Sequence, residues 1–261
     1  MSIATTIFHA QTRSVEEVER ALEKVFKAQN RPSVTRLEGT FSAVLARALD
    51  PNLAANYRYV ICRPHPQSGW TPIIELGVRT VGLEARLSHA LGGAAVFTVF
   101  VYGDGLSGYR LARNGVEVDR YTSDPTYLLD NADIPTEGEV SLEHPDPERE
   151  RGHPERFADL LPEGTAPEDV TRVVLAPGWW ERHDAEIATA STKTAASTEV
   201  ASEGNSEEDD EEEIEEVDEI DRLRCIALAL ELWGPDEYPF AQELEDIPNK
   251  LVGPALLLGF A

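Results

Sequence analysis

Apolar residues recur at three- and four-residue steps in several stretches of the first half of the chain, a pattern typical of helices that bury one face. These stretches are residues 15–29, 41–49 and 82–93. At the start of the first stretch, Ser14 and Glu17 have the spacing of a capping box, in which two side chains cap each other's backbone N–H groups. We therefore expect the first helix to begin directly after Ser14.

Shorter runs of β-branched or alternating residues predict strands at 4–10, 57–63 and 71–77. Residues 94–123 are the best defined, because a continuous apolar run is followed by two strand-like runs on either side of Asn114-Gly115, a strong two-residue hairpin signal. The spacing predicts a three-stranded antiparallel meander. It also predicts that Leu111 lies opposite Val118 on the buried face and that Arg110 lies opposite Asp119 on the exposed one.

The amino-acid composition of the chain changes after residue 130. Six prolines fall within residues 134–169, too closely spaced for a long helix or strand, so residues 131–183 are interpreted as an arm that packs on the first domain. Residues 184–213 hold no aromatic side chain and are rich in Ser, Thr, Ala and acids. Such a segment buries too little apolar surface to offset the loss of chain entropy, which predicts a disordered acidic linker.

Residues 214–261 are interpreted as a short helical C-terminal unit. Ile214 and Val217 open a run of apolar residues at three-residue steps, which predicts a helix over about 213–233, and two shorter helices are expected to follow. The chain finishes on an apolar stretch that is rarely left in water, so it either docks on the N-terminal domain or is covered by another chain. Its large residues are Leu256, Leu257, Leu258 and Phe260.

These patterns together predict an α+β protein. An antiparallel sheet with flanking helices occupies residues 1–130, followed by the Pro-rich arm, the acidic linker and the helical unit.

The net charge of −25 narrows the choice of partners. Residues 203–221 contribute −13 of it, which leaves −12 on the rest of the chain. An acidic surface repels phosphate backbones and anionic lipids, so direct binding to nucleic acid or to a membrane is not expected, and a basic protein is the natural complement. With no signal peptide and no long apolar run, the chain is expected to be a cytoplasmic protein. Its two cysteines, Cys62 and Cys225, are too few for a disulfide framework or a thiolate zinc site.

Catalytic signatures are scarce. The sequence has no phosphate-binding loop, dinucleotide fingerprint, nucleophile elbow or HExxH motif, so no catalytic residue and no cofactor is expected. One stretch could supply oxygen and imidazole ligands to a divalent metal, although its spacing matches no standard site and a solvated loop is the simpler interpretation. Its candidate ligands are His144, Asp146, Glu148 and His153.

The sequence therefore favours a non-enzymatic interaction or regulatory module, such as an adaptor, inhibitor or immunity-type protein that binds another, basic protein. Trp179 and Trp180 are candidate anchors, because aromatic residues dominate interface hot spots. The apolar residues Ile214 and Val217 and the four large residues of the C-terminus are further candidates. Two alternatives stay open: a metal-dependent hydrolase or nuclease-like enzyme, and a DNA mimic that inhibits a nucleic-acid-binding protein.

Overall fold

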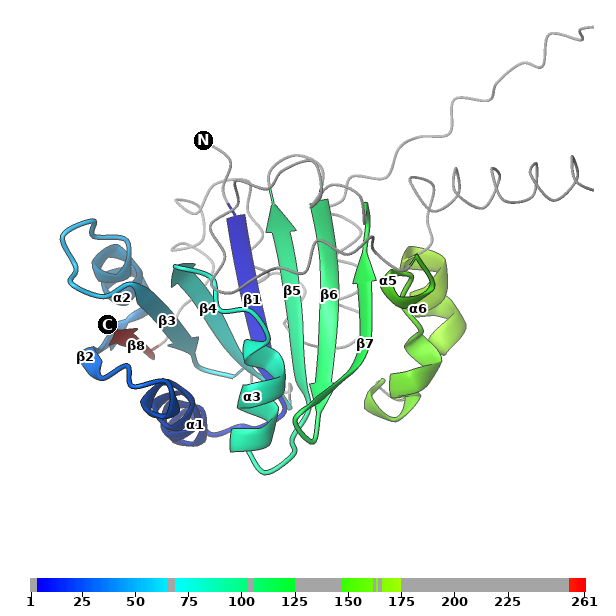
Figure 1. Ribbon diagram of the computed structural model, residues 1–261, viewed down its shortest axis with the longest axis horizontal. Coiled ribbons are helices and arrows are strands. Elements are labelled where there is room, and N and C mark those ends of the chain that lie inside the picture. The colour runs from blue at the N-terminus through cyan, green and yellow to red at the C-terminus, as the bar shows by residue number, and fades with distance from the viewer. Residues whose placement is uncertain are drawn as a thin grey trace, which may run out of the picture.

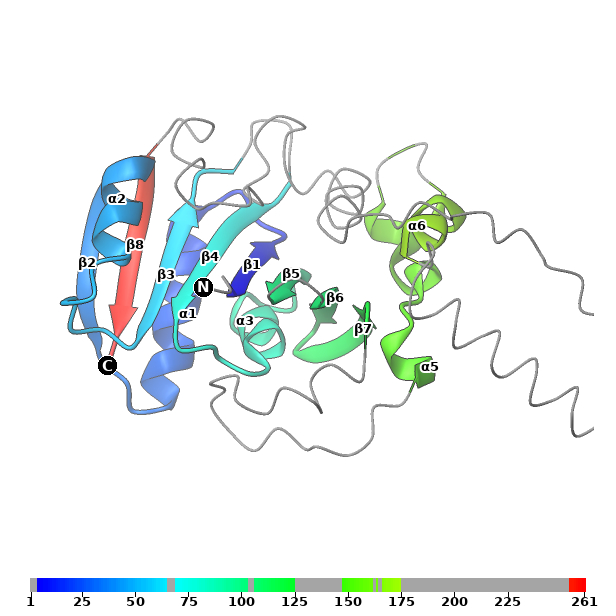
Figure 2. The ribbon, with the colours of Figure 1, turned by 90° about the horizontal axis from the view of Figure 1, so that it is seen from above.

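A single antiparallel sheet organises the protein (Figure 1). The computed structural model describes residues 4–64, 69–102, 106–124, 147–161, 163, 166–174 and 254–261. Eight strands follow one another in the order β2-β8-β3-β4-β1-β5-β6-β7, as Figure 2 shows from above, and every neighbouring pair is antiparallel. The strands are β1 (Ala4–Ala10), β2 (Ser33–Thr40), β3 (Tyr57–Cys62), β4 (Thr71–Gly77), β5 (Val96–Tyr102), β6 (Leu106–Arg113), β7 (Val116–Thr122) and β8 (Pro254–Phe260).

Helices cover both faces of the sheet, which confirms the α+β class. On one face, here called the α1 face, lie α1 (Val15–Ala28) and α3 (Leu83–Ala90). On the opposite α2 face lie α2 (Phe41–Ala48), the 3-10 helix η1 (Pro154–Leu160) and α6 (Pro167–Val174), while α5 (Pro147–Glu150) lies beside β7. Each face has its own apolar core, so the central strands are buried on both sides.

The three helices predicted in the first half of the chain are confirmed, and the start of α1 shows how its cap works. The Ser14 hydroxyl accepts the Glu17 N–H at 3.1 Å, as a capping box requires. The reciprocal bond of a capping box would run from the Ser14 N–H to the Glu17 carboxylate. Here the Ser14 N–H donates to Thr12 Oγ1 instead, and the Glu17 carboxylate accepts from the Thr12 hydroxyl at 2.6 Å. Thr12 thus completes a cap that the sequence pattern assigned to two residues.

The apolar C-terminus is a strand inside the sheet, so the prediction of a helical C-terminal unit is wrong for residues 254–260. β8 lies between β2 and β3 and is antiparallel to both. Leu256 and Leu258 enter the core of the α1 face, whereas Leu257 enters that of the α2 face. A run that is apolar on both sides suits a strand covered on both faces, and over so few residues its periodicity does not separate strand from helix. Of the two places expected for the C-terminus, the structure gives the N-terminal sheet.

The hairpin of β6 and β7 forms at Asn114-Gly115, where both residues have positive φ angles, and the predicted meander is confirmed. The predicted register is wrong beyond its first two pairs. A bulge places Leu111 opposite Asp119 and Arg110 opposite Arg120, because Val118 is an extra residue on β7. Asp119 therefore turns into the α2 face, where it is 2% exposed, instead of facing solvent beside Arg110.

Residues 147–161 run along β7 and the α2 face. Arg151 makes a bridge to Tyr121 on β7, and the Arg113 guanidinium holds the Asp159 carboxylate with bonds of 3.0 and 2.9 Å. Phe157 is fully buried and meets the rings of Phe97 and Tyr109 edge-on. This part of the chain therefore covers one edge of the sheet. The predicted linker at 184–213 and the predicted helices within 214–253 lie outside the described residues.

Candidate functional site

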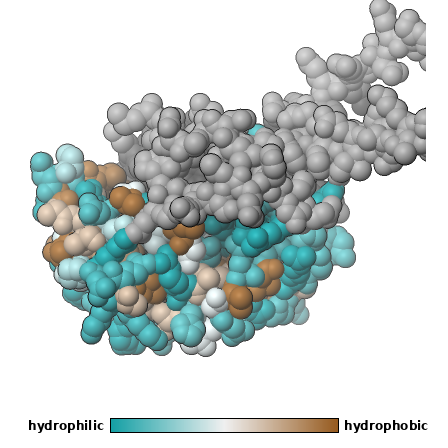
Figure 3. Space-filling view, viewed as in Figure 1, coloured by the Kyte–Doolittle hydropathy of each residue, from teal (hydrophilic) through white to brown (hydrophobic). Residues whose placement is uncertain are grey.

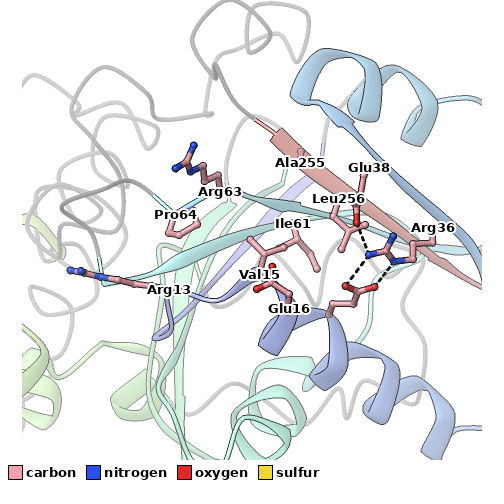
Figure 4. Close-up of a pocket in the computed structure, with 11 residues that line it drawn as sticks. Arg13, Val15, Glu16, Arg36, Glu38, Ile61, Arg63, Pro64, Ala255 and Leu256 are labelled. Carbon is pink, nitrogen blue, oxygen red and sulfur yellow. Dashed lines mark hydrogen bonds and ion pairs between the residues drawn. The ribbon is translucent and has the colours of Figure 1, made fainter.

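A groove of about 530 Å³ opens on the α1 face, between the first turns of α1 and the strands β2, β8 and β3 (Figure 4). We call it the α1 groove. Apolar side chains form its floor and charged ones its two ends. Its lining residues are Arg13, Val15, Glu16, Glu19, Arg36, Glu38, Ile61, Arg63, Pro64, Ala255 and Leu256.

The groove lies beside the first turns of α1, away from the aromatic contacts at the other end of the helix. Near the C-terminus of the helix, the ring of Phe26 stacks on Phe260 with centroids 4.3 Å apart, and it also contacts Tyr57 and Tyr59. In the first turns, the helix presents charged residues toward β2 in place of such rings. Large aromatic side chains close the interface at one end, and shorter ionised ones leave space at the other.

An ion cluster fixes the β2 side of the groove. Arg36 Nε lies 2.6 Å from Glu19 Oε1, and one of its terminal nitrogens lies 2.6 Å from Glu38 Oε1. Hydrogen bonds to these two carboxylates raise the pKa of Arg36 above its ordinary value. Because Arg36 joins α1 to the edge strand, the side chains at this end of the groove are held in place.

The other charged residues lie toward the N-terminal side of α1. The pKa of Glu16 is lowered, first by a hydrogen bond with its own backbone N–H and then by the Ser14 hydroxyl 2.9 Å away. Arg13 and Arg63 lie apart from the Arg36 cluster in Figure 4. The groove is thus polarised, with two arginines at one end and a carboxylate-rich cluster at the other.

The groove is lined by ionised and apolar side chains, and its carboxylates are those of Glu16, Glu19 and Glu38. Glu16 is stabilised in its charged form, as is Arg36, so these groups are poor proton donors or acceptors near neutral pH. The remaining lining residues include no Ser, Cys, His, Lys or Tyr that could act as a nucleophile. What the groove offers is an apolar floor framed by fixed charges, the usual form of a recognition site.

A second polar cluster, on the same face, surrounds the buried carboxyl group of Glu75. Burial raises the pKa of Glu75 on β4 from 4.5 to about 7. Glu75 Oε1 accepts from the Tyr59 hydroxyl and from the Thr80 N–H, both at 3.0 Å. Such a value would suit a general acid. Glu75 is only 6% exposed, however, and it does not line the α1 groove, so we assign it to the core of the fold.

A third polar cluster lies on the α2 face and holds residues 147–161 against β7. Asp119 Oδ2 accepts from the Tyr109 hydroxyl at 2.8 Å and from the His153 N–H at 2.9 Å, and Arg156 lies 3.5 Å from Oδ1. Burial raises the pKa of Asp119 despite these partners. The sequence treated Asp119 as an exposed residue, and only the bulge in β7 brings it into this position.

Of the four residues predicted as metal ligands, only His153 has a described side chain, so the predicted metal site stays a prediction. His153 is described, and its Nδ1 lies 3.2 Å from the Glu155 carboxylate. His144, Asp146 and the side chain of Glu148 lie outside the described residues. Among the residues that the structure does describe, no three His, Cys, Asp or Glu side chains are placed to share a metal ion.

The residues predicted to contact a partner divide into two groups. Trp179, Trp180, Ile214 and Val217 lie outside the described residues, so their predicted role stays a prediction. The C-terminal residues are buried in β8: Leu257, Leu258 and Phe260 are at most 1% exposed. They therefore stabilise the sheet from within, and Leu256 alone of these four also reaches the α1 groove.

Sequence reasoning missed the α1 groove because its residues are spread over four separate segments. The only local signals were the Arg36-x-Glu38 pair on a segment that was not predicted to be a strand, and the acidic first turn of α1. Neither signal indicates a cavity until β8 brings the two segments together.

In the part of the chain that the structure describes, no helix is both long and apolar enough to cross a membrane. No family model, no curated protein and no solved structure matches this chain.

Proposed function

We propose that the protein is a non-enzymatic binding module, of the adaptor, inhibitor or immunity type, that captures another, basic protein through the α1 groove. The observation that carries this proposal is the lining of that groove. Its apolar floor can bury a side chain of the partner, and its ionised residues can orient that partner.

The charge of the whole chain supports a basic partner. The whole chain carries a net charge of −25, which attracts a basic protein over distances longer than any contact and raises the rate of encounter. The described residues contain 18 Lys and Arg and 18 Asp and Glu, so this excess negative charge belongs to the other residues of the chain. Most of the surface visible in Figure 3 among the described residues is hydrophilic, with scattered apolar side chains. The groove then supplies the short-range contacts that select one basic protein from others.

The test is affinity capture by the full chain, compared with two variants of equal charge. Glu16→Lys reverses a charge in the groove, and Glu168→Lys makes the same change on α6, an exposed position beyond the β7 edge of the sheet (Figure 2). Both variants lose the same amount of negative charge. If the groove selects the partner, Glu16→Lys weakens capture of a stoichiometric partner by about tenfold, whereas Glu168→Lys retains it apart from a small loss.

The full-length chain is needed in every arm of this experiment. A chain that ends at residue 183 or 212 would also lack β8, and loss of binding would then report a broken sheet. Equal weakening by the two variants would mean that long-range charge alone drives binding. That result, or the capture of no stoichiometric partner at low or moderate salt, would refute the proposal.

A further inference from the structure

The two edges of the sheet differ in how they are protected. Along β7, the bridge from Tyr121 to Arg151 and the packing of α5 cover the edge. β2, at the opposite end of the strand order, has no further strand on its outer side within the described residues (Figure 2). Its outward-facing N–H and C=O groups can therefore pair with another strand.

β2 offers a regular segment from Thr35 to Thr40, because the one irregularity in its pairing with β8 falls between Ser33 and Thr35. It runs for eight residues, contains no proline, and exposes the side chains of Val34 (46%) and Leu37 (37%). It carries two charged residues, of which Arg36 binds both Glu38 and, on the α1 side, Glu19. A long edge strand of this kind is a template for β-augmentation.

The residue order of β2 indicates which strand would fit. When two copies of the segment Thr35–Gly39 are aligned antiparallel about Leu37, Arg36 of each copy lies opposite Glu38 of the other. Leu37 then meets its own counterpart, and the small Gly39 lies opposite Thr35. Cross-strand pairs of opposite charge stabilise antiparallel strands, and like charges in the same place destabilise them.

We propose that β2 pairs with β2 of a second copy of this chain, antiparallel about a two-fold axis at Leu37, and joins the two sheets into one. A two-fold axis requires such self-complementarity, because every contact is made twice. Glu19 already holds Arg36 in an ordered position, so pairing costs less side-chain entropy than it would for a free arginine. This inference goes beyond the proposed function, although Arg36 and Glu38 also line the α1 groove. Self-association measures it separately from capture of a partner, which is tested through Glu16.

Pairing of a single edge strand buries little area, so the dimer is expected to be weak, with a dissociation constant in the micromolar range or above. Sedimentation velocity of the full chain over a wide concentration range measures it. Arg36→Glu places a glutamate opposite Glu38 of the other copy, and the two-fold axis repeats this repulsion. The substitution should therefore raise the dissociation constant about tenfold. The double variant Arg36→Glu, Glu38→Arg restores opposite charges across the axis and should recover most of the affinity. Thermal unfolding of each variant reports any damage to the monomer.

A cross-linking experiment tests the position of the axis. In a Cys225→Ala background, where the remaining Cys62 is buried, Leu37→Cys brings two thiols together at the axis and should give a disulfide-linked dimer on mild oxidation. Glu38→Cys, one residue away, separates the two thiols by two positions across the strands and should cross-link far less. A monomer at all concentrations would overturn the proposal. A dimer that is indifferent to Arg36→Glu, or equal cross-linking at both positions, would also overturn it.

Discussion

Replacing Glu75 by Gln should change how the stability of the protein depends on pH. Burial raises the pKa of Glu75 from 4.5 to about 7 in the folded protein, whereas in the unfolded chain the carboxyl group returns to its ordinary value. The amide of the glutamine would keep an oxygen that accepts from the Tyr59 hydroxyl and the Thr80 N–H, as Glu75 Oε1 does now. The substitution thus removes the ionisation and preserves both hydrogen bonds.

The direction in which stability changes with pH depends on whether the folded or the unfolded state holds the proton. Below pH 4.5 the carboxyl group is protonated in both states, and its full contribution to stability is present. Between pH 4.5 and about 7 the unfolded chain releases the proton while the folded protein retains it, so stability falls as the pH rises. Above about pH 7 the charge must be buried. The total loss is roughly 3 kcal/mol, since each tenfold change in proton affinity is worth about 1.4 kcal/mol.

The assay is urea denaturation of the wild type and Glu75→Gln between pH 4.5 and 8.5. The difference in the free energy of unfolding, variant minus wild type, should increase by about 3 kcal/mol across this range and level off above pH 7. His9 acts in the opposite direction, because burial lowers its pKa to about 3 and stability falls as the pH drops below 6.5. That effect is common to both proteins and cancels in the difference.

Glu23→Gln, on the exposed side of α1, makes the same chemical change and serves as the control. It reports any effect of the amide that has nothing to do with burial. If the difference between wild type and Glu75→Gln stays constant with pH, Glu75 does not titrate as inferred. The assignment of this cluster to the core would then be wrong.

Three further predictions concern the sheet and the segment packed on it. Ending the chain at residue 253 removes β8 from between β2 and β3, so the truncated protein should lose cooperative thermal unfolding by circular dichroism; a native-like transition would contradict the topology. Asp119→Ala leaves the Tyr109 hydroxyl and the His153 N–H without their acceptor, which should lower the free energy of unfolding by about 2–4 kcal/mol. Proteolytic cleavage within 147–161 should become faster, and an unchanged cleavage rate would mean that Asp119 does not hold this segment. Gly108→Ala places a methyl group against the Tyr121 carbonyl oxygen and should cost about 1–3 kcal/mol in urea denaturation, whereas a neutral effect would mean that β6 and β7 are not packed as described.

Local patterns were enough to find most elements of the first 124 residues. The helices α1, α2 and α3 and the strands β1 and β3 to β7 lie where periodicity placed them, because each signal is contained within one short segment. β2 was missed because it is an edge strand with mostly exposed residues and no alternation of apolar and polar side chains. Its strand conformation depends on pairing with β8.

The sequence also determined that the C-terminal stretch had to be covered, and its apolar composition alone required this. Only the tertiary structure decided that the cover is the protein's own sheet, since strand pairing between residues more than two hundred positions apart leaves no periodic trace in either segment. The same holds for Asp119, which one bulged residue moves from solvent to the core. Local preferences fix what a segment can become. Long-range pairing fixes which residues meet, and so formed both the α1 groove and, among the described residues, the edge at β2.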